Sequence, residues 1–170
     1  MDMKFFVLFI IVLFILNGCS KDDNSNPVNP EKNATGFVRG DVNGTNWYSN
    51  KITTIKSGNT RIVKATQDFT NDPIFSSSIL EFRIGVGQSG VSGIGEDEPG
   101  FKYYVKAYYT LVSRSGTNDE NYKAYFENIS FLTINRITDK DLDAAFTFTA
   151  RTDDSLKTIV FTNGSIQIAY

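Results

Sequence analysis

The side chains that most often carry out catalysis are scarce in this sequence. Among its 170 residues there is no histidine, and Cys19 is the single cysteine. The absence of histidine excludes Ser-His-Asp and Cys-His catalysis as well as histidine-ligated zinc. A single cysteine excludes an intramolecular disulfide and a cysteine-rich metal cage. These absences exclude a large share of enzyme chemistry, and we expect no catalytic centre, no cofactor and no metal.

The acidic residues do not follow a known catalytic or metal-binding pattern. Asp139, Asp141 and Asp143 have the D-x-D-x-D spacing of a calcium loop, but Ala144 and Ala150 stand where an EF-hand has glycine and glutamate. Glycosidases use two carboxylates about 5–9 Å apart, and no spacing in the sequence selects such a pair. We therefore interpret the acidic clusters as solvated turns.

Residues 85–90 match the letters G-x-G-x-x-G and follow an alternating apolar segment. A dinucleotide site also needs a helix whose N-terminus meets the pyrophosphate. The next residues are rich in glycine and acidic side chains and end in Pro99-Gly100, which does not favour a helix. This segment is interpreted as a flexible loop.

One alternating segment offers a candidate contact surface. Lys102, Tyr104, Lys106 and Tyr108 share one face of a predicted strand over 101–109. Because tyrosine combines apolar area with a hydroxyl, an exposed strip of this kind would suit contact with a glycan or an envelope protein. The alternative is that lysine stems and tyrosine rings only cover the sheet, since cross-strand aromatic pairs stabilise sheets by themselves.

Period-2 alternation dominates from Gly36 onward and indicates β-strands. Leu80, Phe82 and Ile84, for example, alternate with polar residues. The other expected strands are 37–42, 47–49, 51–56, 60–67, 101–109, 122–126, 129–137, 146–151, 156–161 and 166–170. At most one helical turn is expected, near 139–144. This pattern predicts an all-β domain, an antiparallel β-sandwich of about 8–10 short strands, with a closed lipocalin-like β-barrel as the alternative.

Turn residues support the same fold. Asn43-Gly44 and Asn163-Gly164 each have the signature of a two-residue hairpin turn, in which both central residues need positive φ. Ser57-Gly58-Asn59 is a third turn candidate. Trp47 and Tyr48 follow the first turn and are expected in the core or at its rim.

The N-terminal segment predicts an export signal and a tether. Residues 5–16 form an unbroken apolar run, which as a helix would span about 18 Å, short of the ~30 Å of bilayer hydrocarbon. This length suits the core of a signal peptide over residues 1–18. Residues 19–35 are polar apart from the cysteine, Val28 and Ala34, and are expected to form a disordered tether before a single domain at 36–170.

Two short motifs lie between the apolar run and the tether. Leu16-Asn17-Gly18-Cys19 resembles the lipobox of bacterial lipoproteins, which implies cleavage between Gly18 and Cys19 and lipidation of Cys19, for instance with palmitate. Ser20, Lys21, Asp22 and Asp23 resemble the export signal that sends Bacteroidota-type lipoproteins to the outside of the outer membrane. Because two or more acyl chains anchor a protein stably, the resemblance implies membrane attachment through lipid.

The domain itself shows a further, limited resemblance. Residues 41–47 are similar to the D-x-x-G-x-x-W opening of an uncharacterised family of flavobacterial lipoproteins, and residues 145–148 and 159–166 to its closing hairpin. The resemblance implies a β-rich lipoprotein and carries no activity.

The near-neutral charge narrows the expected function. With 17 basic and 19 acidic residues the net charge is −2, which does not fit a nucleic-acid binder. We expect a lipid-anchored cell-surface protein that acts as a non-catalytic binding or assembly module, with a glycan or an envelope protein as partner. The alternatives are a carboxylate-using hydrolase or lyase and a structural envelope component.

Overall fold

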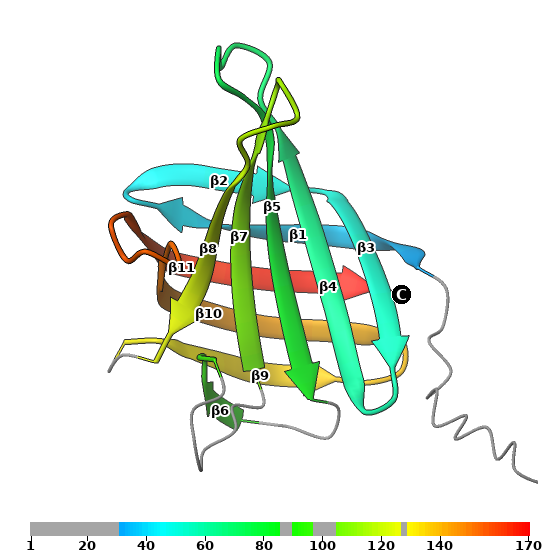
Figure 1. Cartoon of the computed structure of the whole chain (residues 1–170). Helices are drawn as coiled ribbons and strands as arrows, with labels where there is room; N and C mark the ends of the chain where they lie inside the picture. The colour runs from blue at the N-terminus through cyan, green and yellow to red at the C-terminus, as the bar shows by residue number, and fades with distance from the viewer. Residues whose placement is uncertain (1–30, 86–89, 97–104, 127–128) are drawn as a thin grey trace, which may run out of the picture.

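The computed structural model describes residues 31–85, 90–96, 105–126 and 129–170, which form an antiparallel β-structure (Figure 1). The strands are β1 (Lys32–Val42), β2 (Thr45–Ser49), β3 (Lys51–Ser57), β4 (Thr60–Asp68), β5 (Phe75–Gly85), β6 (Gly90–Gly93), β7 (Val105–Ser113), β8 (Glu120–Tyr125), β9 (Phe131–Ile137), β10 (Asp141–Arg151) and β11 (Thr158–Ala169). In these parts of the chain there is no helix long and apolar enough to span a bilayer. The all-β prediction is confirmed.

Hydrogen bonding closes the sheet on itself. From β1 the pairing runs through β3, β4, β5, β7, β8 and β10 to β11, which pairs with β1 again. In Figure 1 the strands β3, β4, β5, β7 and β8 form a front layer that crosses β1, β11, β10 and β9 behind it. The fold therefore combines the two packed layers of a sandwich with the closed ring of a barrel, as orthogonal β-packings do.

Aromatic rings fill the space between the two layers. Phe82 of β5 meets Phe146 of β10 with ring centroids 4.8 Å apart, and Phe148 and Phe161 stack at 4.6 Å. Tyr109 of β7 packs edge-on against Phe161 at 5.2 Å. Lipocalin barrels hold a small ligand in this interior space. Here the side chains of the described core residues occupy it.

A buried polar contact links β2 to the front layer. Trp47 is 2 % exposed, and its Nε1 donates a hydrogen bond of 2.8 Å to Oγ of Ser78, which is fully buried. The expectation of a core position is confirmed for Trp47. Tyr48, the next residue, points to the opposite side of the strand and is 46 % exposed.

Two of the three predicted turns are confirmed and one is wrong. Asn43 and Gly44 have positive φ and connect β1 to β2, and Gly58 does the same between β3 and β4. Asn163-Gly164 lies inside β11, where the register shifts against both β1 and β10. The positive φ of Asn163 therefore belongs to a bulge, and the two strands expected on either side of this pair are one strand.

Two further expectations differ from the structure. β1 begins at Lys32, so the last residues of the predicted tether are part of the sheet, where Lys32–Ala34 pair with Ile52–Thr54 of β3. Backbone pairing needs no apolar sequence, which explains why composition missed this extension. The expected helical turn near 139–144 is a bend followed by the start of β10.

Candidate functional site

The predicted lysine–tyrosine strip lies partly within the described residues. Lys106 and Tyr108 are on the outer side of β7, while Val105, Ala107 and Tyr109 face the core, which confirms the expected alternation. Lys102 and Tyr104 lie outside the described residues. The role of this strip as a contact surface stays a prediction.

Tyr108 and Lys106 are engaged with charged neighbours on their own layer. The guanidinium of Arg83 lies over the Tyr108 ring, 4.8 Å from its centroid, and donates from Nε to Oε1 of Glu81 at 2.6 Å. Nζ of Lys106 lies 4.0 Å from a carboxylate oxygen of Glu96. Burial, followed by the Glu96 carboxylate, raises the pKa of Tyr108. Both side chains thus contact charged neighbours on the sheet, as expected if the strip mainly covers it.

The back layer carries a groove on its outer side. It has a volume of about 440 Å³ and is lined by Thr35 and Gly36 of β1, Arg136 of β9, Asp141, Leu142 and Asp143 of β10, and Gln167, Ile168 and Ala169 of β11. Gly36 has a φ of +119°, and a Cβ at this position would lie 2.0 Å from the backbone oxygen of Gln167. The close approach of β1 to β11 thus requires glycine, and the missing side chain helps to hollow the surface.

Polar side chains from β9, β10 and β11 line this groove. Nε of Arg136 is 3.1 Å from Oδ1 of Asp141, and Nδ2 of Asn135 donates to Oδ1 of Asp143 at 3.3 Å. Gln167 is exposed and lies opposite Asp143 in the pairing of β10 with β11. The groove therefore offers hydrogen-bond donors and acceptors side by side.

An aromatic pair adjoins the groove. Phe37 of β1 lies directly opposite Gln167 in the pairing with β11. Its ring stacks on Tyr48 of β2 with centroids 6.3 Å apart and an interplanar angle of 24°. The guanidinium of Arg39 lies 5.1 Å from the Phe37 centroid. Arg39 and Tyr48 both contact the Phe37 ring, and the exposed part of Tyr48 continues the surface of the groove across β1 to β2.

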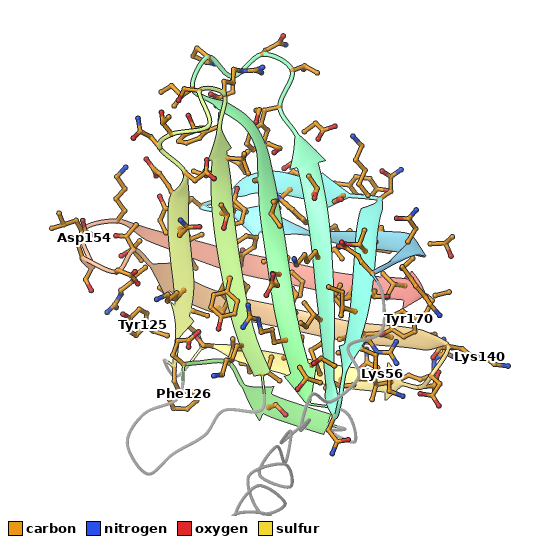
Figure 2. The ribbon with its side chains drawn as sticks, turned by 45° about the vertical axis from the view of Figure 1, so that its right-hand side comes forward. Lys56, Tyr125, Phe126, Lys140, Asp154 and Tyr170 are labelled. Carbon is orange, nitrogen blue, oxygen red and sulfur yellow. The ribbon has the colours of Figure 1, made fainter. Side chains whose placement is uncertain are left out.

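A third cluster closes the end of the barrel where β3, β10 and β11 meet. Figure 2 shows Lys56, Lys140 and Tyr170 together at this end. The guanidinium of Arg61 lies 3.8 Å from the centroid of the Tyr170 ring, and its side chain is only 7 % exposed. Burial raises the pKa of Tyr170 to about 12. This cluster is a structural cap, because the ring covers the buried cation.

The acidic candidates do not come together in the structure. Asp139 is 85 % exposed beside Lys56, and Asp141 and Asp143 point outward from β10. Within the described ranges no three acidic, histidine or cysteine side chains are grouped to hold a metal ion. Most of the glycine motif at 85–90 lies outside the described residues.

Sequence reasoning singled out Asp141 and Asp143 only as a calcium-loop spacing and did not predict the groove or its aromatic neighbours. Phe37 and Arg39 alternate with buried Val38, so their outward direction was readable from the sequence. The position of Phe37 opposite Gln167 was not readable, because β1 and β11 are far apart in the sequence.

The predicted lipidation and export residues Gly18, Cys19, Ser20, Lys21, Asp22 and Asp23 lie outside the described residues. Comparison with protein-family models, curated proteins and solved structures gives no match.

Proposed function

We propose that this protein is a lipid-anchored component of the cell envelope, displayed on the outside of an outer membrane, and that its β-domain is a non-catalytic binding module. The sequence motif at Cys19 supports the anchor, and the polar stretch after it supports a tether. The acidic export motif Lys21-Asp22-Asp23 supports outward display.

The groove on the back layer is the observation that carries the binding role. The described interior is filled by apolar and aromatic side chains, whereas the groove is lined by polar side chains that reach the surface. Its two carboxylates, Asp141 and Asp143, lie on the same side of one strand and accept hydrogen bonds from neighbouring side chains. An acid–base pair for hydrolysis would instead flank a bond from two sides, so the arrangement favours binding.

The anchor is tested by labelling cells with a palmitate analogue. We expect label on the full chain and none on a Cys19→Ala variant, with Cys19→Ala still made at a comparable level. Label that persists in the variant would refute lipidation at this residue.

Display is tested by protease treatment of intact cells. We expect digestion of the native protein and protection of a Lys21/Asp22/Asp23→Ala variant, with lysed cells as the control in which both are digested. Protection of both proteins on intact cells would place the domain on the inner side of the membrane and contradict the proposal.

A further inference from the structure

The groove contains groups of both charges and of both hydrogen-bonding types. Arg136 supplies N–H donors, and Asp141 and Asp143 supply acceptors. The amide of Gln167 can donate and accept, and its side chain has no partner among the described residues. An anionic ligand would meet the two carboxylates, and a cationic one would meet the guanidinium. A neutral ligand rich in hydroxyls avoids both conflicts, because each hydroxyl donates and accepts.

The aromatic pair fits the apolar side of such a ligand. Tyr48 is nearly half exposed, and Phe37 lies opposite the Gln167 amide. The C–H faces of sugar rings are apolar and pack on aromatic faces, while their hydroxyls point to the sides. The ring pair and the polar groove are adjacent on one sheet face, so one chain of sugars can contact both.

The pairing of the strands argues against an extended peptide. β11 is bonded on one side to β1 and on the other to β10, over nearly its whole length. A peptide that binds to a sheet by strand addition needs an unpaired edge, which β11 does not offer. The backbone groups of β11 that form the ladder are therefore not available to a peptide, and the exposed polar side chains of the groove suit hydroxyl recognition.

From these observations we infer that the groove, together with Phe37 and Tyr48, binds a neutral glycan chain along the outer face of the back layer. This inference rests on the proposed function, since it names the ligand class of the same site. The open groove fits the side of a polysaccharide better than a small molecule, which binding sites normally enclose.

The test is affinity gel electrophoresis of the full chain in detergent micelles. The gels contain dextran, mannan, xyloglucan, galactan or mixed-linkage β-glucan as neutral probes and polygalacturonate as an anionic one. We expect at least one neutral polysaccharide to retard the protein. Gln167→Ala and Tyr48→Ala should each weaken that binding about tenfold, the effect of losing about 1.4 kcal/mol of contact.

Matched controls lie on the front layer. Asn121→Ala and Tyr125→Ala remove an exposed amide and an exposed tyrosine from β8, and we expect both to bind like the native protein. Since all four side chains are on the surface, circular dichroism should show the same fold for every variant.

Failure to bind any neutral probe would overturn the inference, as would binding that is equal in the groove variants and the native protein. If polygalacturonate alone retards the protein and Gln167→Ala abolishes this retardation, a neutral glycan is refuted as the ligand, while the groove remains the binding site. Lipid anchoring and display are judged separately, by the labelling and protease experiments.

Discussion

Replacing Tyr170 by leucine or phenylalanine separates two contributions to the cap at the end of the barrel. The Arg61 guanidinium lies 3.8 Å from the ring centroid, and its Nε has no hydrogen-bond partner among the described residues. Its nearest carboxylate, on the exposed Asp139, is 4.0 Å away. Nη2 of Arg61 also donates a long hydrogen bond of 3.5 Å to the backbone oxygen of Thr138, so this carbonyl and the Tyr170 ring together stabilise the buried charge.

The expected magnitude follows from this geometry. A desolvated cation–π contact contributes about 2 kcal/mol or more, so Tyr170→Leu should lower the free energy of unfolding by about 2–3 kcal/mol. For a domain of this size that corresponds to a fall in Tm of about 6–9 °C. Tyr170→Phe keeps the ring and removes a hydroxyl that is buried without a partner in the described part of the chain. Its stability should be unchanged or higher by up to about 1 kcal/mol.

Urea unfolding followed by fluorescence measures both effects, because Trp47 is the only tryptophan and is buried. Tyr125→Leu is the matched control: Tyr125 faces Arg151 at 5.5 Å but is 36 % exposed, so its loss should cost less than about 1 kcal/mol. If Tyr170→Phe loses as much stability as Tyr170→Leu, the hydroxyl and not the ring stabilises the cap. If Tyr170→Leu is as stable as the native protein, groups other than the Tyr170 ring stabilise the positive charge of Arg61.

Three other results are expected. Because the pKa of the Tyr170 hydroxyl is raised in the folded protein, the unfolded chain loses this proton at a lower pH, and the free energy of unfolding should fall as pH rises from about 10 to about 12. Urea midpoints measured over this pH range should fall less steeply for Tyr170→Phe than for the native protein. Equal pH dependence in the two proteins would contradict the assignment to Tyr170. Ser78→Ala leaves the indole N–H of Trp47 buried without its acceptor, so it should lower the free energy of unfolding by about 1–3 kcal/mol and shift the fluorescence maximum of Trp47. An unchanged urea midpoint would show that this hydrogen bond does not contribute to stability. Gly164→Ala would place a Cβ 2.4 Å from the Phe146 ring and should cost about 1–3 kcal/mol in urea unfolding. Adding Phe146→Leu should recover part of the Gly164→Ala loss, and strictly additive costs would refute the clash.

Local patterns predicted the strands well and their partners poorly. The alternation around Phe82 and Tyr108 correctly assigned inner and outer faces, because the side-chain period of a strand is a property of the strand alone. Asn43-Gly44 and Asn163-Gly164 look alike in the sequence, yet the first is a turn and the second a bulge. The difference comes from the partner strands: β11 continues past the bulge because β1 and β10 pair with it on both sides.

The candidate groove shows the same limit for the site. Its polar side chains point outward as their strands predict, but Phe37, Gln167 and Asp143 become neighbours only through the pairing of β1, β11 and β10. The lysine–tyrosine strip was visible because its residues are close in the sequence. A site that joins β1 to the last three strands of the sheet has no such local pattern.

The pairing of the first strand with the last also governs when this chain can fold. β1 forms a local hairpin with β2, but an isolated hairpin is only marginally stable in water. The ring closes only when β11 is available, and contacts between such distant segments form slowly because the long intervening loop must be ordered first. A chain that emerges from the ribosome N-terminus first therefore lacks the closing partner of β1 until β11 has also been made. An export route of the proposed kind would benefit from this delay, because it would keep the polypeptide unfolded while it crosses a membrane.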